Sequence, residues 1–273
     1  MRLAIDHRTR YHFSEAQDRV VQLLRMTPHD FGAQTVLDWS IGVNCNARLR
    51  DGHDGYGNQT SMLYIDGPIT DVEIIVSGEV LTDDHGGLVF GVPETLPPGF
   101  FLRQTPLTIA DEAVADLAHQ LTDGVSDPMR QAGLIAIDLF ARMEVKAGRT
   151  PKSRTAAEAL GKGWGSVRDK THVMLAVARA AGLPARFVSG HCLDGINVAG
   201  HHSAHCWAEV YADGTGWVAL DPCTGHHIGE SYVRVAIGLD ASDATPLSGT
   251  RTGGGIEELD VDVRVALSQS ASQ

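Results

Sequence analysis

The segment 163–221 constrains the fold more than any other part of the sequence, because a helical pattern in it runs directly into three strand patterns. The helical pattern begins near Val167 and ends at Gly182 and Pro184, which are typical helix-stop residues. Short apolar strand patterns then follow at about 185–192, 204–211 and 216–221. Consecutive strands joined by short connections usually pair with each other, so the segment predicts a helix packed on an antiparallel sheet.

The first 82 residues have the pattern of a separate β-domain. Short stretches of apolar alternation are separated by turn signals, namely the Gly- and Asp-rich residues 51–58 and the pair Gly67–Pro68. We therefore expect an antiparallel β-sandwich over 1–82, followed by a Gly- and Pro-rich linker over 83–107. The fold class predicted for the whole chain is α+β, with residues 108–273 forming the second domain.

Further helices are predicted between the linker and the helix that begins near Val167. Their patterns lie at about 108–122, 127–146 and 153–160. Asp127 followed by Pro128 is a typical helix start, because the aspartate caps free amides and proline suits the first helical position. Strand patterns return between 230 and 265 around a Gly-rich turn. The sequence places this tail with the second domain.

Charge and cysteine usage exclude some classes of partner. The formal net charge is −12, whereas nucleic acids and anionic membranes attract basic patches. The four cysteines are scattered and lack a CxxC or similar metal spacing, which favours free thiols in a reducing cytoplasm. The strand-like start lacks the apolar segment of a signal peptide, and no run has the length of a membrane span. We expect a cytoplasmic protein without a nucleic-acid or membrane partner.

Two of the predicted strands carry a histidine and an aspartate in positions that suit acid–base chemistry. Side chains alternate between the two faces of a strand, so His205 and Trp207 share one face while Cys206 points to the other. By the same count Trp217 and Asp221 share a face. We therefore expect His205 and Asp221 to meet as a base and the acid that orients it, with a nitrogen–oxygen distance of about 2.6–3.2 Å.

The motifs around this pair resemble those of transglutaminase-like proteins of the papain-like superfamily, in the bacterial group with its own N-terminal β-domain. The matching stretches are GLPARFVSG at 182–190, AHCWAEV at 204–210 and GWVALDP at 216–222. The segment before them matches at Gly165, Asp169 and His172. Residues 1–80 resemble the N-terminal β-domain of that group. The resemblance therefore covers nearly the whole chain and implies helices packed on an antiparallel sheet.

The resemblance also implies a Cys–His–Asp triad that transfers acyl groups from amides, by proteolysis, deamidation or cross-linking. It assigns the base to His205, the orienting acid to Asp221 and the nucleophile to position 167. Valine occupies that position and has no nucleophilic atom, so thiol chemistry at Val167 is excluded. The chain is expected to keep the scaffold and the acid–base pair while lacking the catalytic cysteine.

Other side chains near the helix start and the strand ends are candidates for a remodelled pocket. Ser166 is adjacent to Val167, but one helical residue turns the side chain by about 100°. Thr171 lies one turn from Val167, and Lys170 is a candidate base if it is desolvated. Cys223 shares the parity of Asp221 and is the candidate for a relocated thiol. The full set of pocket candidates is Trp164, Ser166, Asp169, Lys170, Thr171, His191 and Cys223.

Histidines gather around the predicted strand ends, with six of the thirteen between positions 191 and 227. Imidazoles near an aspartate and a cysteine are typical ligands of a transition metal, and a metal-bound water would replace the missing thiol as nucleophile. The spacing matches no established metal motif, and the alternative is that most of these histidines are solvated loop residues. The candidate metal ligands are His191, His205, Asp221 and His226.

Three functions remain open on the sequence. The first is a divergent hydrolase or acyl transferase that acts on a small-molecule or peptide amide through His205 and Asp221 without a thiol. The second is a catalytically inactive binding or scaffold protein, and the third is an amidase whose thiol has moved to Cys223. We favour the first, because the altered positions gain polar and ligating side chains that a decaying site has no reason to collect.

Overall fold

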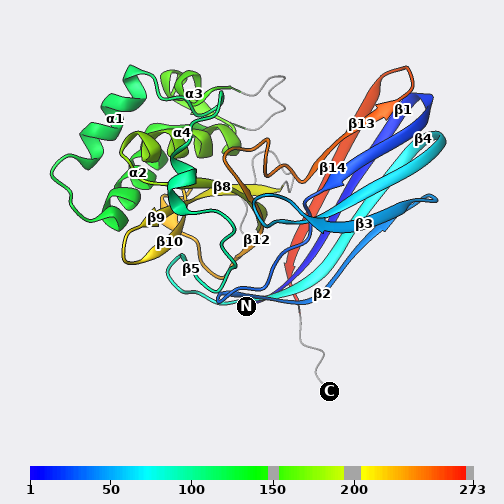
Figure 1. Cartoon of the computed structure of the whole chain (residues 1–273), viewed down its shortest axis with the longest axis horizontal. Helices are drawn as coiled ribbons and strands as arrows, with labels where there is room; N and C mark the ends of the chain where they lie inside the picture. Colours follow the sequence, from blue (N-terminus) through cyan, green and yellow to red (C-terminus); the bar gives the residue numbers. More distant parts are fainter. Residues whose placement is uncertain (147–153, 194–203, 269–273) are drawn as a thin grey trace.

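The computed structural model describes residues 1–146, 154–193 and 204–268. Figure 1 shows two parts side by side, a set of helices lying on a sheet and a group of long strands. The long strands are β1 (Arg2–Leu24) and β4 (Gln59–Thr82), and their neighbours are β2 (Gln34–Val43), β3 (Arg48–His53), β13 (Leu247–Thr252) and β14 (Glu257–Leu267). All of these strands pair antiparallel in one six-stranded sheet.

The two long strands pair with each other along nearly their whole length and organise this sheet in two halves. In one half β14 and β2 flank the pair, and in the other half β13 and β3 do so. The register between β1 and β4 shifts between His12 and Arg19, where one half passes into the other. Buried side chains from both halves, such as Phe13, Val20 and Ile74, form one cluster, so a single apolar core serves both halves of the sheet.

Two features of this sheet differ from the sequence expectation. The pair Gly67–Pro68 lies within β4 and does not end a strand, because it falls at the register shift where the strand changes partners. Strands β13 and β14 belong to the N-terminal sheet, although the sequence placed residues 230–265 with the second domain. Which strands pair depends on residues that are far apart in the sequence, and the alternation within a strand carries no information about its partner.

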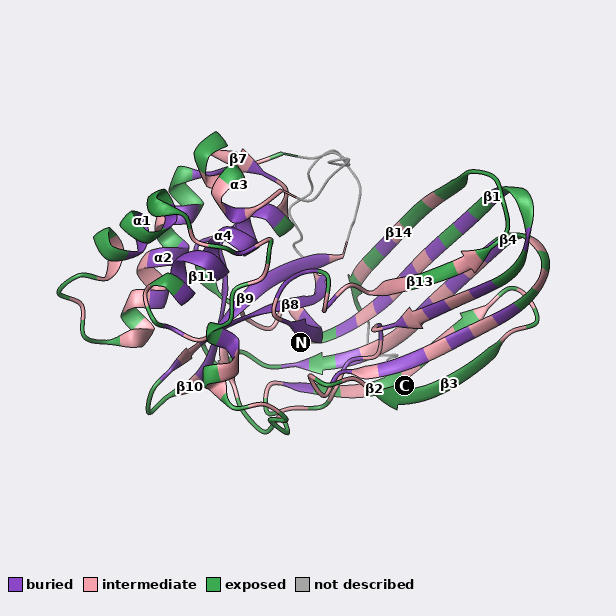
Figure 2. Ribbon diagram, turned by 45° about the horizontal axis from the view of Figure 1, so that its top comes forward, coloured by how far each residue is buried: buried purple, intermediate pink, exposed green. Residues whose placement is uncertain are grey.

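The second part is built around one buried helix. Its helices are α1 (Glu112–Thr122), α2 (Pro128–Arg142), α3 (Ala156–Lys162) and α4 (Val167–Ala180). Helix α4 is buried at every position from Asp169 to Arg179, because the other helices pack on one side of it and the sheet on the other (Figure 2). The predicted start of α2 is confirmed, since the Asp127 side chain accepts a hydrogen bond from the Met129 amide.

The sheet beneath the helices is antiparallel throughout. Its strands run in the order β11 (His226–His227), β10 (Gly216–Asp221), β9 (His205–Ala212), β8 (Ala185–Cys192) and β12 (Tyr232–Gly238), and β5 (Leu88–Val89) also pairs with β10. Cys206 and Ala208 of β9 face the helices, whereas Trp207 and Glu209 face the other way. The remaining strands, β6 (Glu144–Val145) and β7 (Trp164–Gly165), form a short parallel pair.

The segment predicted as a linker packs against the second sheet. Strand β5 pairs with β10, and the short helix η1 (Pro98–Leu102) buries Phe101 completely. Glu94 forms an ion pair with the buried Arg186 at 2.8 Å. The two parts of the molecule also meet directly, since the Gln34 side chain bonds to the backbone of Arg234 through both of its polar atoms. None of the described helices is both long and apolar enough to cross a membrane.

Candidate functional site

The expected pair of His205 and Asp221 is present. His205 is the first residue of β9 and Asp221 the last of β10, and the two strands are neighbours. His205 Nε2 lies 2.7 Å from Asp221 Oδ2, within the nitrogen–oxygen distance expected for a base and the acid that orients it. Both side chains are buried, so the hydrogen bond is shielded from water.

Asp221 is held by two further donors. The Cys223 amide donates to Oδ1 at 2.8 Å, and the Tyr232 hydroxyl donates to Oδ2 at 3.0 Å. Burial by itself raises the pKa of Asp221, but the hydrogen bond and charge of His205, together with these two donors, lower it below its usual value. Asp221 is therefore a carboxylate at neutral pH, and His205 donates its Nε2 proton to it. That tautomer leaves a lone pair on Nδ1, which makes no hydrogen bond with the described residues.

Tyr232 was not identified from the sequence. It lies on β12, which is separated from β9 by β8, so it reaches Asp221 only through the order of the strands. Its ring lies 5.8 Å from that of His205 and 5.5 Å from that of Trp207. Burial and the charge of Asp221 raise the pKa of Tyr232, so the phenol stays protonated and donates. No local pattern around Tyr232 indicated this role.

The start of α4 is fixed by a capping box of Ser166 and Asp169. The Ser166 hydroxyl accepts from the Asp169 amide at 3.2 Å, and Asp169 Oδ2 accepts from the Ser166 amide at 2.9 Å. A side chain at Gly165 would lie 2.7 Å from Asp169 Cβ, so the close approach requires glycine. Both pocket candidates therefore serve the helix start. Val167 is the first residue of α4 and packs against the helical core.

Lys170 and Thr171 form internal contacts. The Lys170 ammonium donates to the Met143 carbonyl at 2.8 Å, and burial lowers its pKa. The Thr171 hydroxyl donates to the Val167 carbonyl at 3.0 Å and lies 3.4 Å from the Cys206 carbonyl. Both side chains are buried, so they join α4 to α2 and β9. Neither presents a free reactive atom to solvent.

The thiols nearest the pair are held in the neutral form. Burial raises the pKa of Cys206 to about 12. The pKa of Cys223 is raised well above its usual value, first by burial and then by the charge of Asp221. A thiol is a nucleophile only as the thiolate, so this environment works against a nucleophile at Cys223.

Trp164 carries cations on its ring. The Arg154 guanidinium lies 4.0 Å from the ring centre, with the ammonium groups of Lys146 at 4.9 Å and Lys162 at 5.8 Å. Arg154 also lies 3.8 Å from Asp169, which connects this cluster to the capping box. The sequence named Trp164 as a pocket candidate, and the contacts place it in a cation–π cluster beside the start of α4.

The four candidate metal ligands do not form one cluster, because His205 and Asp221 bond to each other while His191 and His226 lie elsewhere. His191 is buried against His7 and Trp39 at the contact with the N-terminal sheet, with ring distances of 5.6 and 6.5 Å. His226 is exposed on β11, opposite Asp221 in register. Within 1–146, 154–193 and 204–268, no group of three or more His, Cys, Asp or Glu side chains is placed to hold a metal ion. His201 and His202 lie outside the described residues.

The chain is similar to known proteins over both parts. Residues 115–222 match the sequence model of the transglutaminase-like superfamily, and residues 3–81 match that of the bacterial transglutaminase-like N-terminal region. The crystal structure of a "Putative Cysteine Protease" from Cytophaga hutchinsonii has a TM-score of 0.78 at 19% identity, covering 100% of this chain and 92% of that chain. This likeness extends the shared fold over the whole chain.

Similarity in sequence extends to bacterial relatives. An uncharacterised protein of Mycobacterium leprae is 24% identical over 278 residues, which cover 97% of this chain and 98% of the relative. A protein-glutamine gamma-glutamyltransferase of Pseudomonas aeruginosa is 40% identical over 55 residues, or 18% of this chain and 8% of that protein.

Proposed function

We propose that this chain, which belongs to the transglutaminase-like superfamily and carries the bacterial N-terminal region, is a divergent hydrolase that cleaves an amide or related bond with water as the nucleophile. The observation that carries the proposal is the buried pair of His205 and Asp221, joined at 2.7 Å. Two more donors hold Asp221, so the base keeps the orientation that acyl transfer needs although position 167 is valine.

The reaction follows from the tautomer of His205. Its Nδ1 lone pair takes a proton from a water molecule as the water oxygen attacks the carbonyl carbon. The resulting imidazolium is stabilised by the Asp221 carboxylate, and it returns the proton to the leaving nitrogen as the carbon–nitrogen bond breaks. The first amides of α4, at Val167 and Arg168, precede the capped amide of Asp169 and are available as donors to the developing oxyanion.

The environment of the cysteines supports water over a relocated thiol. Cys206 and Cys223 are buried and their pKa values are raised, so neither supplies thiolate near neutral pH. We expect treatment with iodoacetamide to leave the activity intact. Loss of activity in proportion to alkylation of Cys223 would instead favour an amidase with a relocated thiol.

The second candidate is a binding or scaffold protein without catalysis. It is favoured by the way residues at the start of α4 serve packing. Val167 contacts the helical core, and the Lys170 ammonium is tied to the Met143 carbonyl. In that case His205 and Asp221 would be a retained structural hydrogen bond.

The experiment separates the two candidates by the products formed from a mixture of amide-containing peptides in water enriched in oxygen-18. A water nucleophile adds one heavy oxygen to the new carboxyl group. We expect His205→Ala and Asp221→Asn to lower the rate by roughly 100-fold or more, as loss of a general base does. His226→Ala is the matched control. This imidazole is exposed to solvent, and His226 is related to Asp221 only as its paired position on the neighbouring strand β11.

A scaffold gives a different result. Hydrolysis would be absent from the wild type, or equal in the wild type and His205→Ala. Either outcome would rule out the hydrolase and leave the binding protein.

A further inference from the structure

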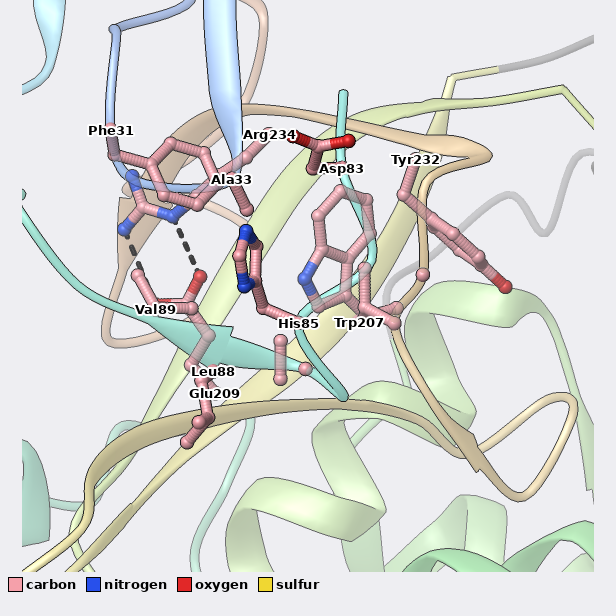
Figure 3. A pocket seen from close by; sticks show the side chains of 14 residues that line it. Phe31, Ala33, Asp83, His85, Leu88, Val89, Trp207, Glu209, Tyr232 and Arg234 are labelled. Atoms are coloured by element: carbon pink, nitrogen blue, oxygen red, sulfur yellow. Dashed lines mark hydrogen bonds and ion pairs between the residues drawn. The ribbon is translucent and has the colours of Figure 1, made fainter. Parts of the chain in front are cut away.

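A small cavity lies between the N-terminal part and the second sheet, on the face of that sheet that points away from the helices (Figure 3). Its volume is about 30 Å³, and its walls include Trp207, Tyr232 and His85. The rings of Trp207 and Tyr232 also pack near His205, but His205 itself does not line the cavity. The cavity is thus a second place for a ligand, next to the pair of His205 and Asp221 and separate from it.

Trp207 directs an unpaired donor into this cavity. Its side chain is 1% exposed, and its indole Nε1 has no hydrogen-bond partner among the described residues. The six-membered ring of the indole fits against Gly190, where an added Cβ would lie 2.5 Å from Cη2. In Figure 3 the nitrogen points the other way, across the cavity toward the imidazole of His85. A buried N–H without a partner costs free energy, so the cavity favours a ligand with an acceptor at its inner end.

The arginine in the cavity wall is already paired with a carboxylate. Glu209 accepts from Arg234 Nε at 2.6 Å and pairs with Arg186 on its other side, while Arg186 also pairs with Glu94. Arg186 and Glu94 lie behind the wall, so Arg234 is the only arginine or lysine among the described lining residues, and its pairing with Glu209 leaves no free guanidinium for an anionic ligand. Asp83 is exposed and lines the same cavity, which further disfavours an anion.

We propose that the cavity binds the head group of a small neutral carboxamide. The carbonyl oxygen accepts from Trp207 Nε1, and the amide N–H groups face Asp83. One water molecule occupies about 10–15 Å³ on this scale, so the cavity admits a head group of two or three heavy atoms. The short apolar tail contacts aliphatic side chains of the wall, namely Leu88, Val89, Ala219 and Ile228. The site rests on the cavity alone and does not depend on the proposed hydrolysis.

The test is an NMR titration of protein labelled with nitrogen-15 in its four tryptophans. Propionamide is compared with propionate, which has nearly the same shape and a negative charge, and with propylammonium, which has a chain of similar length and a positive charge. We expect propionamide to shift the indole N–H signal of Trp207 saturably, and both ions to bind at least about tenfold more weakly. The signal is assigned as the one missing from Trp207→Phe.

Two variants locate the ligand. Ala33→Leu fills the cavity from the segment before β2, and we expect it to weaken propionamide binding at least about tenfold. Ala115→Leu, on the exposed face of α1, is the matched control and leaves binding unchanged. The proposal is overturned by a linear response, by equal responses to the three compounds, or by binding that survives Ala33→Leu. Loss of the titration in His205→Ala would place the ligand at the other site and overturn it as well.

Discussion

At the scale of single residues, the reactivity of a side chain depends on what it is bonded to. Lys170 and Cys223 have the chemistry of a base and a nucleophile, but one donates to a backbone carbonyl and the other is a buried neutral thiol. His205 differs, since its bond to Asp221 leaves Nδ1 with a lone pair. Position 167 is the first of the helix, where amides without helical partners and the helix dipole favour a negative charge.

Replacing Val167 with cysteine tests whether this position keeps the environment of a nucleophile. We expect the new thiol of Val167→Cys to have a lowered pKa, because the start of α4 favours the thiolate and the family resemblance places His205 beside this position. Its alkylation by iodoacetamide, followed by mass spectrometry, is expected to be at least about tenfold faster than that of Cys45 in the same protein. The pKa of Cys45 is raised by burial, so it is an internal reference.

The role of His205 is tested in the same background. Adding His205→Ala to Val167→Cys is expected to slow alkylation of the new thiol and to leave Cys45 unchanged. If the new thiol reacts no faster than Cys45, position 167 is not beside the base. The assignment of the nucleophile position from the family resemblance is then wrong.

At the scale of elements, the consecutive helices α3 and α4 both begin with a capping box. Thr155 and Glu158 form a capping box at the start of α3, as Ser166 and Asp169 do at the start of α4. In each box a side-chain oxygen satisfies an amide that has no partner inside the helix. The difference is the surroundings, because α4 is enclosed by other elements and α3 is partly exposed.

Replacing the residue that caps each helix measures how much the capping box contributes to the stability of the protein. We expect Ser166→Ala to lower the free energy of unfolding by about 1–2 kcal/mol and Thr155→Ala by about 0.5–1 kcal/mol, as measured by urea denaturation. The larger effect is expected at α4, because its capping bonds are partly buried whereas those of α3 are exposed, and water replaces a lost bond less well where it has less access. Equal effects would mean that burial of α4 adds nothing to its cap.

At the scale of the whole molecule, two neutral histidines lie where the N-terminal sheet meets the second one. His7 and His191 are buried, with ring centres 5.6 Å apart, and Nδ1 of each lacks a hydrogen-bond partner among the described residues. Burial lowers the pKa of His7 to about 4. Burial, with a further contribution from His7, lowers the pKa of His191 to about 3. The contact therefore requires both rings to be uncharged.

The sign of the pH effect follows from these values. The unfolded chain takes up protons near pH 6.5, whereas the folded protein resists them down to about pH 4, so acid favours unfolding. We expect the free energy of unfolding to be constant above about pH 6.5. Below it, we expect a fall of at most about 1.4 kcal/mol per pH unit for each histidine. His172 contributes in the same direction, because burial lowers its pKa to about 4.

Urea denaturation between pH 7.5 and pH 4.5 checks this prediction. The double replacement His7→Leu and His191→Leu is expected to reduce the slope, and His12→Leu is the control. His12 is exposed, and its hydrogen bond to Asp71 raises its pKa, so its effect on stability has the opposite sign and His12→Leu is not expected to reduce the slope. A slope that is the same in the double variant and the wild type would contradict the prediction.

The sequence by itself determined the features that depend on neighbouring residues. The alternation of β9 and β10 placed His205 and Asp221 together, Asp127 marked the start of α2, and Gly182 and Pro184 marked the end of α4. The resemblance in the motifs identified the fold. These features follow from the local period of side chains and from backbone preferences, which are written in consecutive residues.

Only the tertiary structure decided which distant residues meet. It joined β13 and β14 to β1, brought Tyr232 to Asp221 across two strands, and moved His191 from the expected rim of the site to a contact with His7. It also enclosed Lys170 and Cys223, which the sequence treated as reactive. The reason is that strand order, register and burial depend on the packing of the whole chain, and no window of consecutive residues contains that information.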